Sequence, residues 1–317
     1  MSYDFKLMVK VASLYYKDGL TQDDISKKIK ISKYQVNRIL KRSVETGVVK
    51  ISINDSMTNI TDLEDKLEKV FNLKRAIVVD NSGLSDKELK AKMGQAASGY
   101  LLEIIKNNDI IGIAWGTTVN EVVTHLPNKI NKKVDIVQVT GGMHQLSVNL
   151  NCQDIARRLA AIFGVEPHLI YAPAIVESSK LRNLLLNESS IKATFNFFNK
   201  IDIAIVGIGA IFPKVTSTFI ETGSFDEDDF KKLKSSNTVG DVSSHFFDIN
   251  GKISEPEIDK RMIAISAEDL FKIPYSIGIA GGEAKAESIL GSLRGKFINI
   301  LVTDSKAAAK ILKLTKQ

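Results

Sequence analysis

The stretch from Thr21 to Asn54 constrains the fold more than any other part of this 317-residue chain. Thr21 can cap a helix with Asp24 in its first turn, and isoleucines four residues apart follow on one helical face. The pattern then breaks, and Ser32 can cap a second helix that Gly47 ends. Apolar and polar residues alternate from there to Asn54, as in a short strand. Two helices joined by a tight turn and followed by a strand predict a winged helix-turn-helix, whose second helix enters the DNA major groove.

The second predicted helix carries side chains that suit contact with DNA. Val36, Ile39 and Leu40 form its apolar side, which leaves polar and basic residues on the other sides. Side chains early in such a helix reach base edges, and lysine or arginine can contact bases or phosphates. The candidate DNA-contacting residues are Lys33, Tyr34, Gln35, Asn37, Arg38 and Lys41. A solvated helical hairpin that binds no DNA can show the same local pattern, so the pattern alone leaves both interpretations open.

The distribution of charge favours DNA binding. Residues 1–54 contain 11 Lys and Arg against 5 Asp and Glu, and the other residues contain 32 of each sign. The chain's net charge of +6 therefore lies entirely in its first 54 residues. Basic side chains concentrated on one segment supply the phosphate contacts that give most non-specific affinity for DNA. We expect this segment to bind double-stranded operator DNA.

Composition excludes several classes of protein. The chain is long enough for two or three domains with sizeable cores, and its apolar runs are too short to span a bilayer. It begins without a signal-peptide pattern, and Cys152 is its only cysteine, so no intrachain disulfide can form. We expect a cytoplasmic protein without membrane contact, in which Cys152 is a small buried side chain. The four histidines show no metal-ligand spacing, and we expect neither a metal nor a cofactor.

Two amphipathic helices flank the predicted DNA-binding helices. Phe5–Lys17 has apolar residues spaced to pack on the helices that follow it. A polar stretch at 55–59 marks the predicted domain boundary. The helix after it has Leu63 and Leu67 in its apolar stripe, and it would connect two domains or form a seam with a second copy. The predicted organisation is a winged helix-turn-helix domain at 1–54, a connector helix at 55–72 and an effector-binding domain at 73–317.

The remainder of the chain alternates between strand and helix periodicity, which predicts an α/β domain built on an open sheet. Several strand candidates are continuous apolar runs, as in parallel sheets covered on both faces. The predicted strands are Ala76–Val79, Ile110–Trp115, Val134–Val139, His168–Tyr171, Ile201–Val206, Ile277–Ala280 and Phe297–Val302. The predicted helices are Asp86–Lys106, Asn120–Leu126, Ile155–Phe163, Lys180–Leu186, Asp228–Lys234, Ala284–Leu293 and Ser305–Leu314.

Four loops rich in glycine follow predicted strands, at residues 115–118, 140–143, 207–209 and 280–285. Ligands of open α/β sheets gather at the carboxyl ends of the strands, which makes these loops candidates for binding. In the first loop, backbone N–H groups and the hydroxyls of Thr117 and Thr118 at a helix start would suit a phosphate or another anion. On local grounds, an ordinary capped turn remains an alternative for the first loop, and close backbone packing at glycine remains one for the glycine pairs.

Two charged residues beside these loops can take part in binding. Lys285 follows Gly281-Gly282 and can pair with a phosphate, form a Schiff base or extend to solvent. Asp241 follows Gly240 and can accept hydrogen bonds from sugar hydroxyls, although a turn or helix cap is an equally good explanation for it. The residues themselves leave these alternatives open.

The order of motifs resembles the SorC family of bacterial transcriptional regulators. Leu14 to Gln22 is similar to the family's N-terminal signature, while Gly240-Asp241 with Phe246-Phe247-Asp248, and Ile279 through Asp304, are similar to its C-terminal signatures. The resemblance covers nearly the whole chain. It implies a sensor domain similar to sugar-phosphate isomerases and deaminases that binds a sugar or sugar phosphate without turning it over. It also implies a homo-oligomer, either a dimer or a tetramer, on a long operator.

The resemblance assigns roles to individual residues. Gly116, Thr117 and Thr118 would hold the phosphate or terminal hydroxyls of the effector, Asp241 its hydroxyls, and Lys285 its anionic or carbonyl end. The remaining implied effector contacts are Thr140, Gly141, Gly142 and Asn149. Family members with a cation directly before the paired glycines have Arg or a Schiff-base Lys there, whereas this chain has Thr140. The departure favours a neutral or singly phosphorylated sugar or polyol over a bisphosphate.

Two other classes of function remain compatible with these residues. One is a sugar-phosphate isomerase or deaminase with an appended DNA-binding domain, because fold does not fix function. The other is a DNA-binding scaffold without a ligand. The predicted DNA-binding segment and the absence of a recognisable acid/base constellation argue against the first. In the second, the glycine loops would be merely structural. We therefore expect a non-enzymatic regulator of a carbohydrate-utilisation operon.

Overall fold

The computed structural model describes residues 5–49, 55–143, 151–212, 215–217, 220 and 225–315, apart from the side chains of 55–58. Within it the chain divides into two compact units, residues 1–58 and 59–317, which we call the N-terminal and C-terminal units. The predicted boundary follows Asn54, and the predicted connector covers 55–72. A helix, α4, does span Asp55–Phe71, and from Asn59 onward it belongs to the C-terminal unit.

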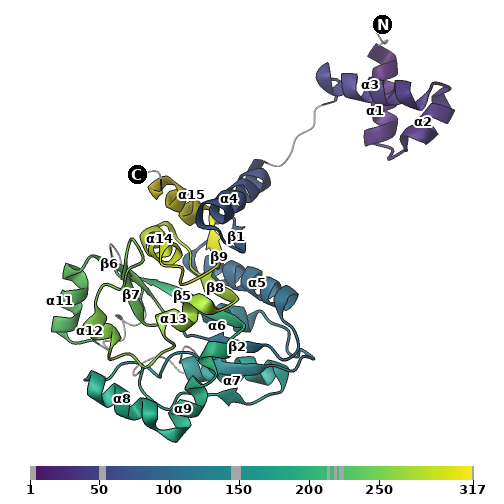
Figure 1. Cartoon of the computed structure of the whole chain (residues 1–317). Helices are drawn as coiled ribbons and strands as arrows, with labels where there is room; N and C mark the ends of the chain where they lie inside the picture. The colour runs from purple at the N-terminus through teal and green to yellow at the C-terminus, as the bar shows by residue number, and fades with distance from the viewer. Residues whose placement is uncertain are drawn as a thin grey trace. The chain divides into compact units, whose positions relative to one another are not determined.

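The N-terminal unit contains α1 (Phe5–Tyr16), α2 (Gln22–Ile29) and α3 (Lys33–Glu45), labelled in Figure 1. Val11, Ile25 and Ile39 are fully buried where the three helices meet. A unit this small has few such side chains, so its helices depend strongly on their caps. The predicted strand at 49–53 lies almost entirely outside the described residues.

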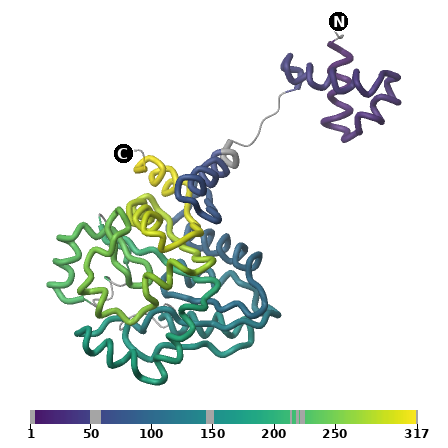
Figure 2. The backbone as a smooth tube through the Cα atoms, viewed as in Figure 1, coloured from purple at the N-terminus to yellow at the C-terminus, as the bar shows by residue number. Residues whose placement is uncertain are grey.

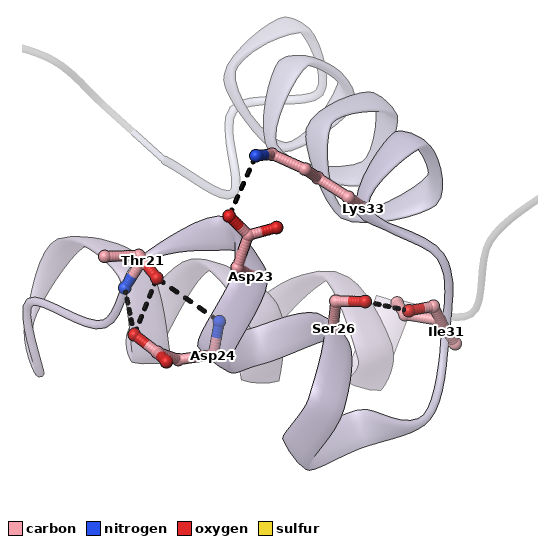
Figure 3. Close-up of polar contacts among 6 residues, drawn as sticks. All are labelled: Thr21, Asp23, Asp24, Ser26, Ile31 and Lys33. Carbon is pink, nitrogen blue, oxygen red and sulfur yellow. Dashed lines mark hydrogen bonds and ion pairs between the residues drawn. The ribbon is translucent and has the colours of Figure 1, made fainter.

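The caps of α2 and α3 set the turn between them. Thr21 and Asp24 bond reciprocally at the start of α2, as Figure 3 shows, and Ser32 and Gln35 do the same at the start of α3. Lys30 ends α2 in the left-handed region at φ 58°. Across the turn, the hydroxyl of Ser26 donates a hydrogen bond of 2.6 Å to the carbonyl oxygen of Ile31. The helix-turn-helix is therefore encoded locally, by capping side chains.

The C-terminal unit is an α/β domain around one sheet, as predicted. Seven strands form a parallel path in the order β1-β9-β8-β5-β2-β3-β4, and β6 and β7 form an antiparallel extension from β5. The strands are β1 (Arg75–Val79), β2 (Ile110–Ile113), β3 (Asp135–Gln138), β4 (Pro167–His168), β5 (Ile203–Ala210), β6 (Thr238–Val242), β7 (His245–Asp248), β8 (Tyr275–Ile279) and β9 (Ile300–Asp304).

The helices cover both faces of this sheet (Figure 1). One face packs against α5 (Asp86–Ile104), α6 (Thr117–Thr124) and α7 (Cys152–Phe163). The other packs against α4, α13 (Ala267–Lys272), α14 (Ala286–Arg294) and α15 (Ser305–Leu314). The other helices are α8 (Ser179–Asn187), α9 (Ser189–Phe195), α11 (Glu227–Ser235) and α12 (Pro256–Asp259), with short 3-10 turns η2 (Phe198–Lys200) and η3 (Glu283–Lys285).

Alternation along β5 shows how the two faces arise. Ile203 and Ile205 belong to the core with α5–α7, whereas Ala204 and Val206 belong to the core with α14 and α15. All four side chains are buried, which explains why the strand reads as a continuous apolar run. The backbone tube in Figure 2 follows the alternation of strand and helix through this unit.

Several predictions about individual elements need correction. The antiparallel hairpin β6–β7 was not predicted, and residues 207–209 continue β5 rather than forming a loop. Leu63 and Leu67 of α4 are buried in the core of their own chain, with exposures of 8% and 0%. These two leucines are therefore not available to a second copy, and the prediction that the helix forms a seam with one stays a prediction for its exposed side.

Candidate functional site

Two hollows lie where the parallel strands end at their carboxyl side. An inner hollow of about 40 Å³ lies beside Asp241 and the end of β5, and an outer hollow of about 430 Å³ extends past Met93 and the Gly281-Gly282 turn. Four residues line both: Thr117, Thr118, Thr216 and Lys285. Because the shared residues make the hollows neighbours, one small molecule can occupy both of them.

The start of α6 forms one wall of these hollows. Gly116 precedes the helix at φ 133°, a backbone conformation that favours glycine, and no described side chain caps the first N–H groups. Thr118 is buried, and its hydroxyl donates to the Ile279 carbonyl at 3.3 Å. An uncapped helix start presents N–H donors and a partial positive charge, which suits an anionic or strongly polar group.

Asp241 provides a buried carboxylate at the inner hollow. It lies on β6 opposite Gly209 of β5, and Ser217 donates a hydroxyl hydrogen bond of 2.6 Å to its Oδ1. Burial raises the pKa of the Asp241 carboxyl, while the Ser217 hydrogen bond and the charges of Lys285 and His245 act in the opposite direction. A Cβ at position 209 would lie 2.1 Å from Oδ1, so only glycine fits opposite this carboxylate.

Lys285 places an ammonium group between the two hollows. Its Nζ donates to the Ile208 carbonyl at 2.9 Å, which directs the side chain toward the end of β5. The turn before it is held by Asp304, whose carboxylate accepts from the Gly282 N–H and also caps α15. Asn81 donates to the same carboxylate. The signature residues from Ile279 to Asp304 thus position one cation at the hollow.

The second predicted loop, at 140–143, is not part of this site. Thr140 is fully buried with its hydroxyl 3.7 Å from the Cys152 thiol. The Gly141 N–H donates to the Ile263 carbonyl and the Gly142 N–H to the Ala172 carbonyl, each at 2.8 Å. These N–H groups are already used within the fold, and none of the three residues lines either hollow. Asn149 lies outside the described residues.

Several lining residues lie outside the effector contacts assigned from sequence, although two of them belong to the candidate loop at 207–209. Gly207 and Gly209 line the inner hollow because β5 runs past it. Thr216 and Ser243 line it from segments that contain no predicted strand or helix. The Gly-x-Gly spacing was visible but was interpreted as a loop. Nothing local marked Ser243, because a serine pair between two short strands resembles any polar turn.

The described residues contain neither a metal cluster nor a spanning helix. They include no group of three or more His, Cys, Asp or Glu able to hold a metal ion. None of their helices is both long and apolar enough to cross a bilayer. Cys152 is buried as predicted, and burial raises the pKa of its thiol to about 12, which keeps it protonated and unreactive.

In the N-terminal unit, the six candidate DNA-contacting residues all lie on the exposed surface of α3. Tyr34 is 75% exposed, so its ring is accessible to a bound duplex. Lys33 forms an ion pair of 2.9 Å with Asp23 of α2, drawn in Figure 3. Gln35 has a second role, because its carboxamide oxygen accepts from the Ser32 backbone at 2.9 Å and so caps α3.

Comparison with known proteins gives consistent matches over the chain. The family described as "Putative sugar-binding domain" matches residues 55–313. The sorbitol operon regulator of Klebsiella pneumoniae is 32% identical over 314 residues, which cover 98% of this chain and 99% of that protein. The deoxyribonucleoside regulator of Bacillus subtilis is 28% identical, with 97% of each chain covered.

Solved structures agree with these matches. The full-length sorbitol operon regulator SorC from Klebsiella pneumoniae superposes with a TM-score of 0.76, covering 98% of this chain and all of that one. A transcriptional regulator from Streptococcus pneumoniae, 29% identical, superposes with a TM-score of 0.77 over 82% of this chain and 99% of that one.

Proposed function

The chain belongs to the SorC family of sugar-responsive transcriptional regulators, and from this premise we propose that it binds operator DNA through α3 and is controlled by a sugar, polyol or sugar phosphate held in the two hollows. The observation that carries the proposal is the convergence of the α6 start, Asp241 and Lys285 on one small volume. These groups come from segments far apart in the sequence.

The chemistry of the hollows fits a polyhydroxyl ligand with at most one strongly anionic end. The α6 start and Lys285 supply donors and positive charge for a phosphate or a terminal oxygen. Asp241, whose carboxylate is held by Ser217, supplies an acceptor oxygen for hydroxyl groups on the other side. Among the described residues, Lys285 is the one cation that lines the inner hollow, and Lys90, which lines the outer hollow, forms an ion pair of 2.7 Å with Asp86. A neutral or singly phosphorylated sugar or polyol therefore fits better than a bisphosphate.

The DNA-binding half of the proposal rests on α3. Its exposed face carries the basic and amide side chains that reach phosphates and base edges in helix-turn-helix proteins. A single helix-turn-helix unit of this size makes few base contacts, so operator-level specificity requires at least two copies of the chain on the DNA. We expect a homo-oligomer, a dimer or a tetramer, and light scattering of the operator complex will measure it; a monomer bound to operator would contradict this part.

The proposal is tested by measuring operator affinity with and without candidate effectors. Fluorescence anisotropy with DNA from upstream of the protein's own operon gives the affinity and its salt dependence. The panel comprises hexoses, hexitols and their monophosphates. We expect one class of compound to shift operator affinity, because a ligand changes DNA binding only through its differential affinity for the two states. An operator affinity that no member of the panel changes would contradict it.

We propose binding without turnover. The relatives described above are named as regulators, and Asp241 is the only carboxylate among the described residues that line the inner hollow. An isomerase or deaminase needs a positioned general base and acid next to the reacting carbon. Incubation with sugar phosphates, followed by assays for aldose–ketose interconversion and released ammonia, distinguishes the two functions. Turnover at a rate above background would favour the enzyme.

A further inference from the structure

The turn between β6 and β7 has an arrangement that its sequence does not favour. Ser243 and Ser244 are its two central residues, and their φ angles are 49° and 72°. Positive φ at both positions is the pattern of a type I′ turn, in which glycine, asparagine and aspartate predominate. Two serines therefore hold a backbone conformation that other residues would adopt more easily.

Both serine hydroxyls are buried and lack a hydrogen-bond partner among the described residues. Ser243 is 5% exposed and Ser244 is fully buried. Buried hydroxyls in folded proteins are normally hydrogen-bonded, so an unpartnered one calls for an explanation. The two differ in one respect, because Ser243 lines the inner hollow and Ser244 does not.

The size of the inner hollow limits what can meet Ser243. Its volume of about 40 Å³ holds roughly three water-sized groups, at 10–15 Å³ for each. A whole sugar does not fit, but one hydroxyl-bearing end of a sugar or polyol does, with the remainder in the outer hollow of about 430 Å³. Asp241, two residues before Ser243, already provides an acceptor at the same wall.

We infer that Ser243 is a specificity-determining residue that hydrogen-bonds a hydroxyl of the effector's inserted end, so that the site distinguishes a polyol from its deoxy analogue. This rests on the proposed effector site and adds a residue and a ligand group to it. A serine hydroxyl both donates and accepts, so it can complete a chain from the ligand hydroxyl to a neighbouring oxygen. A ligand without that hydroxyl leaves Ser243 unpaired, and a site built for a hydroxyl rejects such a ligand.

The turn supplies a matched control for the test. Ser243→Ala and Ser244→Ala each remove one buried, unpartnered hydroxyl at positive φ, so both should raise the melting temperature of the ligand-free protein. Only Ser243→Ala should weaken the tightest-binding hexitol or sugar monophosphate of the panel, by about 2- to 10-fold in isothermal titration. Ser243→Gly, which suits the positive φ, provides the same deletion if the alanine variant fails to fold.

Monodeoxy analogues of that ligand identify the partner hydroxyl. One analogue should lose affinity for the wild-type protein and show no further loss with Ser243→Ala, because the same contact is already absent. Equal affinity of wild type and Ser243→Ala for the parent ligand would overturn the inference while leaving the proposed function intact, as would an equal loss in Ser244→Ala. Absence of binding by the wild-type protein to every panel member would overturn both.

Discussion

Replacing Lys285 with methionine tests the anionic end of the proposed site most directly. Methionine keeps an unbranched apolar stem and removes the ammonium group. In the ligand-free protein, the change removes the hydrogen bond of 2.9 Å to the Ile208 carbonyl. A hydrogen bond from a charged donor contributes about 1.5–3 kcal/mol, so the variant should fold with a moderate loss of stability.

The variant should also bind a phosphorylated effector more weakly. A hydrogen bond to a charged group contributes about 1.5–3 kcal/mol, which corresponds to a roughly 10- to 150-fold weaker effector affinity. Operator affinity without effector should stay close to that of the wild type, because Lys285 lies in the C-terminal unit. The predicted phenotype is therefore a regulator that binds DNA but responds only at much higher effector concentration.

The assay is operator anisotropy titrated with matched pairs of a hexitol and its monophosphate. Lys310→Met is the control: Lys310 lies 3.8 Å from Glu283, but it lines neither hollow. This control removes the same charge and should keep the wild-type response. A wild-type response in Lys285→Met would place the anion elsewhere. Loss of operator binding without effector would instead make Lys285 a structural residue.

Three other substitutions test separate parts of the proposal. Gln35→Glu keeps the side-chain oxygen that accepts from Ser32 and caps α3, but it loses the amide donor that can contact a base. The binding free energy for operator, relative to that for random DNA, should therefore weaken by about 1–3 kcal/mol. If anisotropy gives the same ratio of operator to random-DNA affinity as the wild type, Gln35 does not contact bases. Leu67→Ala should lower the free energy of unfolding by about 2–5 kcal/mol in urea melts without dissociating the oligomer, because Leu67 is fully buried in its own chain; dissociation without destabilisation would contradict its placement. Burial raises the pKa of Asp241, so the stability linked to its protonated form is present below the ordinary aspartate pKa and is lost as pH rises through the raised value. Asp241→Asn, which can still accept from Ser217, should therefore stabilise the ligand-free protein more at neutral than at acidic pH while it weakens effector binding, and equal shifts in melting temperature at both pH values would refute this.

Elements with strong local signals were predictable from sequence. The helix predicted at Ser305–Leu314 has those bounds in the structure, since Asp304 caps its first turn and its apolar residues repeat at helical spacing. The helix-turn-helix was predictable for the same reason, because Thr21 and Ser32 both form capping boxes. In each case, residues within three or four positions of one another determine the structure.

The β6–β7 hairpin was missed because its local signals are misleading. Thr238–Val242 contains Gly240 and Asp241, which are typical of turns, although both are buried within a strand. The true turn, Ser243-Ser244, lacks the glycine or asparagine expected there. A Cβ at Gly240 would lie 2.4 Å from the Gly209 carbonyl oxygen, so this glycine is required by the neighbouring strand. Pairing with β5 overrides the local preference of these residues for a turn. Because the paired residues of β5 lie some thirty positions away in the sequence, the sequence around Gly240 does not indicate this pairing.

The glycine loops show the same limit for the functional site. The loops at 116–118 and 140–142 both follow parallel strands, and both contain predicted effector contacts. Their difference lies in which backbone groups already have partners. The second loop donates its N–H groups to the carbonyls of Ile263 and Ala172, whereas the first leaves the start of α6 uncapped beside the hollows. A donor that is already paired within the fold has to break that bond before it can bind a ligand, which offsets most of the gain. Which loop can bind a ligand therefore depends on the segments around 172 and 263, because their carbonyls occupy the N–H groups of the second loop. The positions of those segments depend on the tertiary fold.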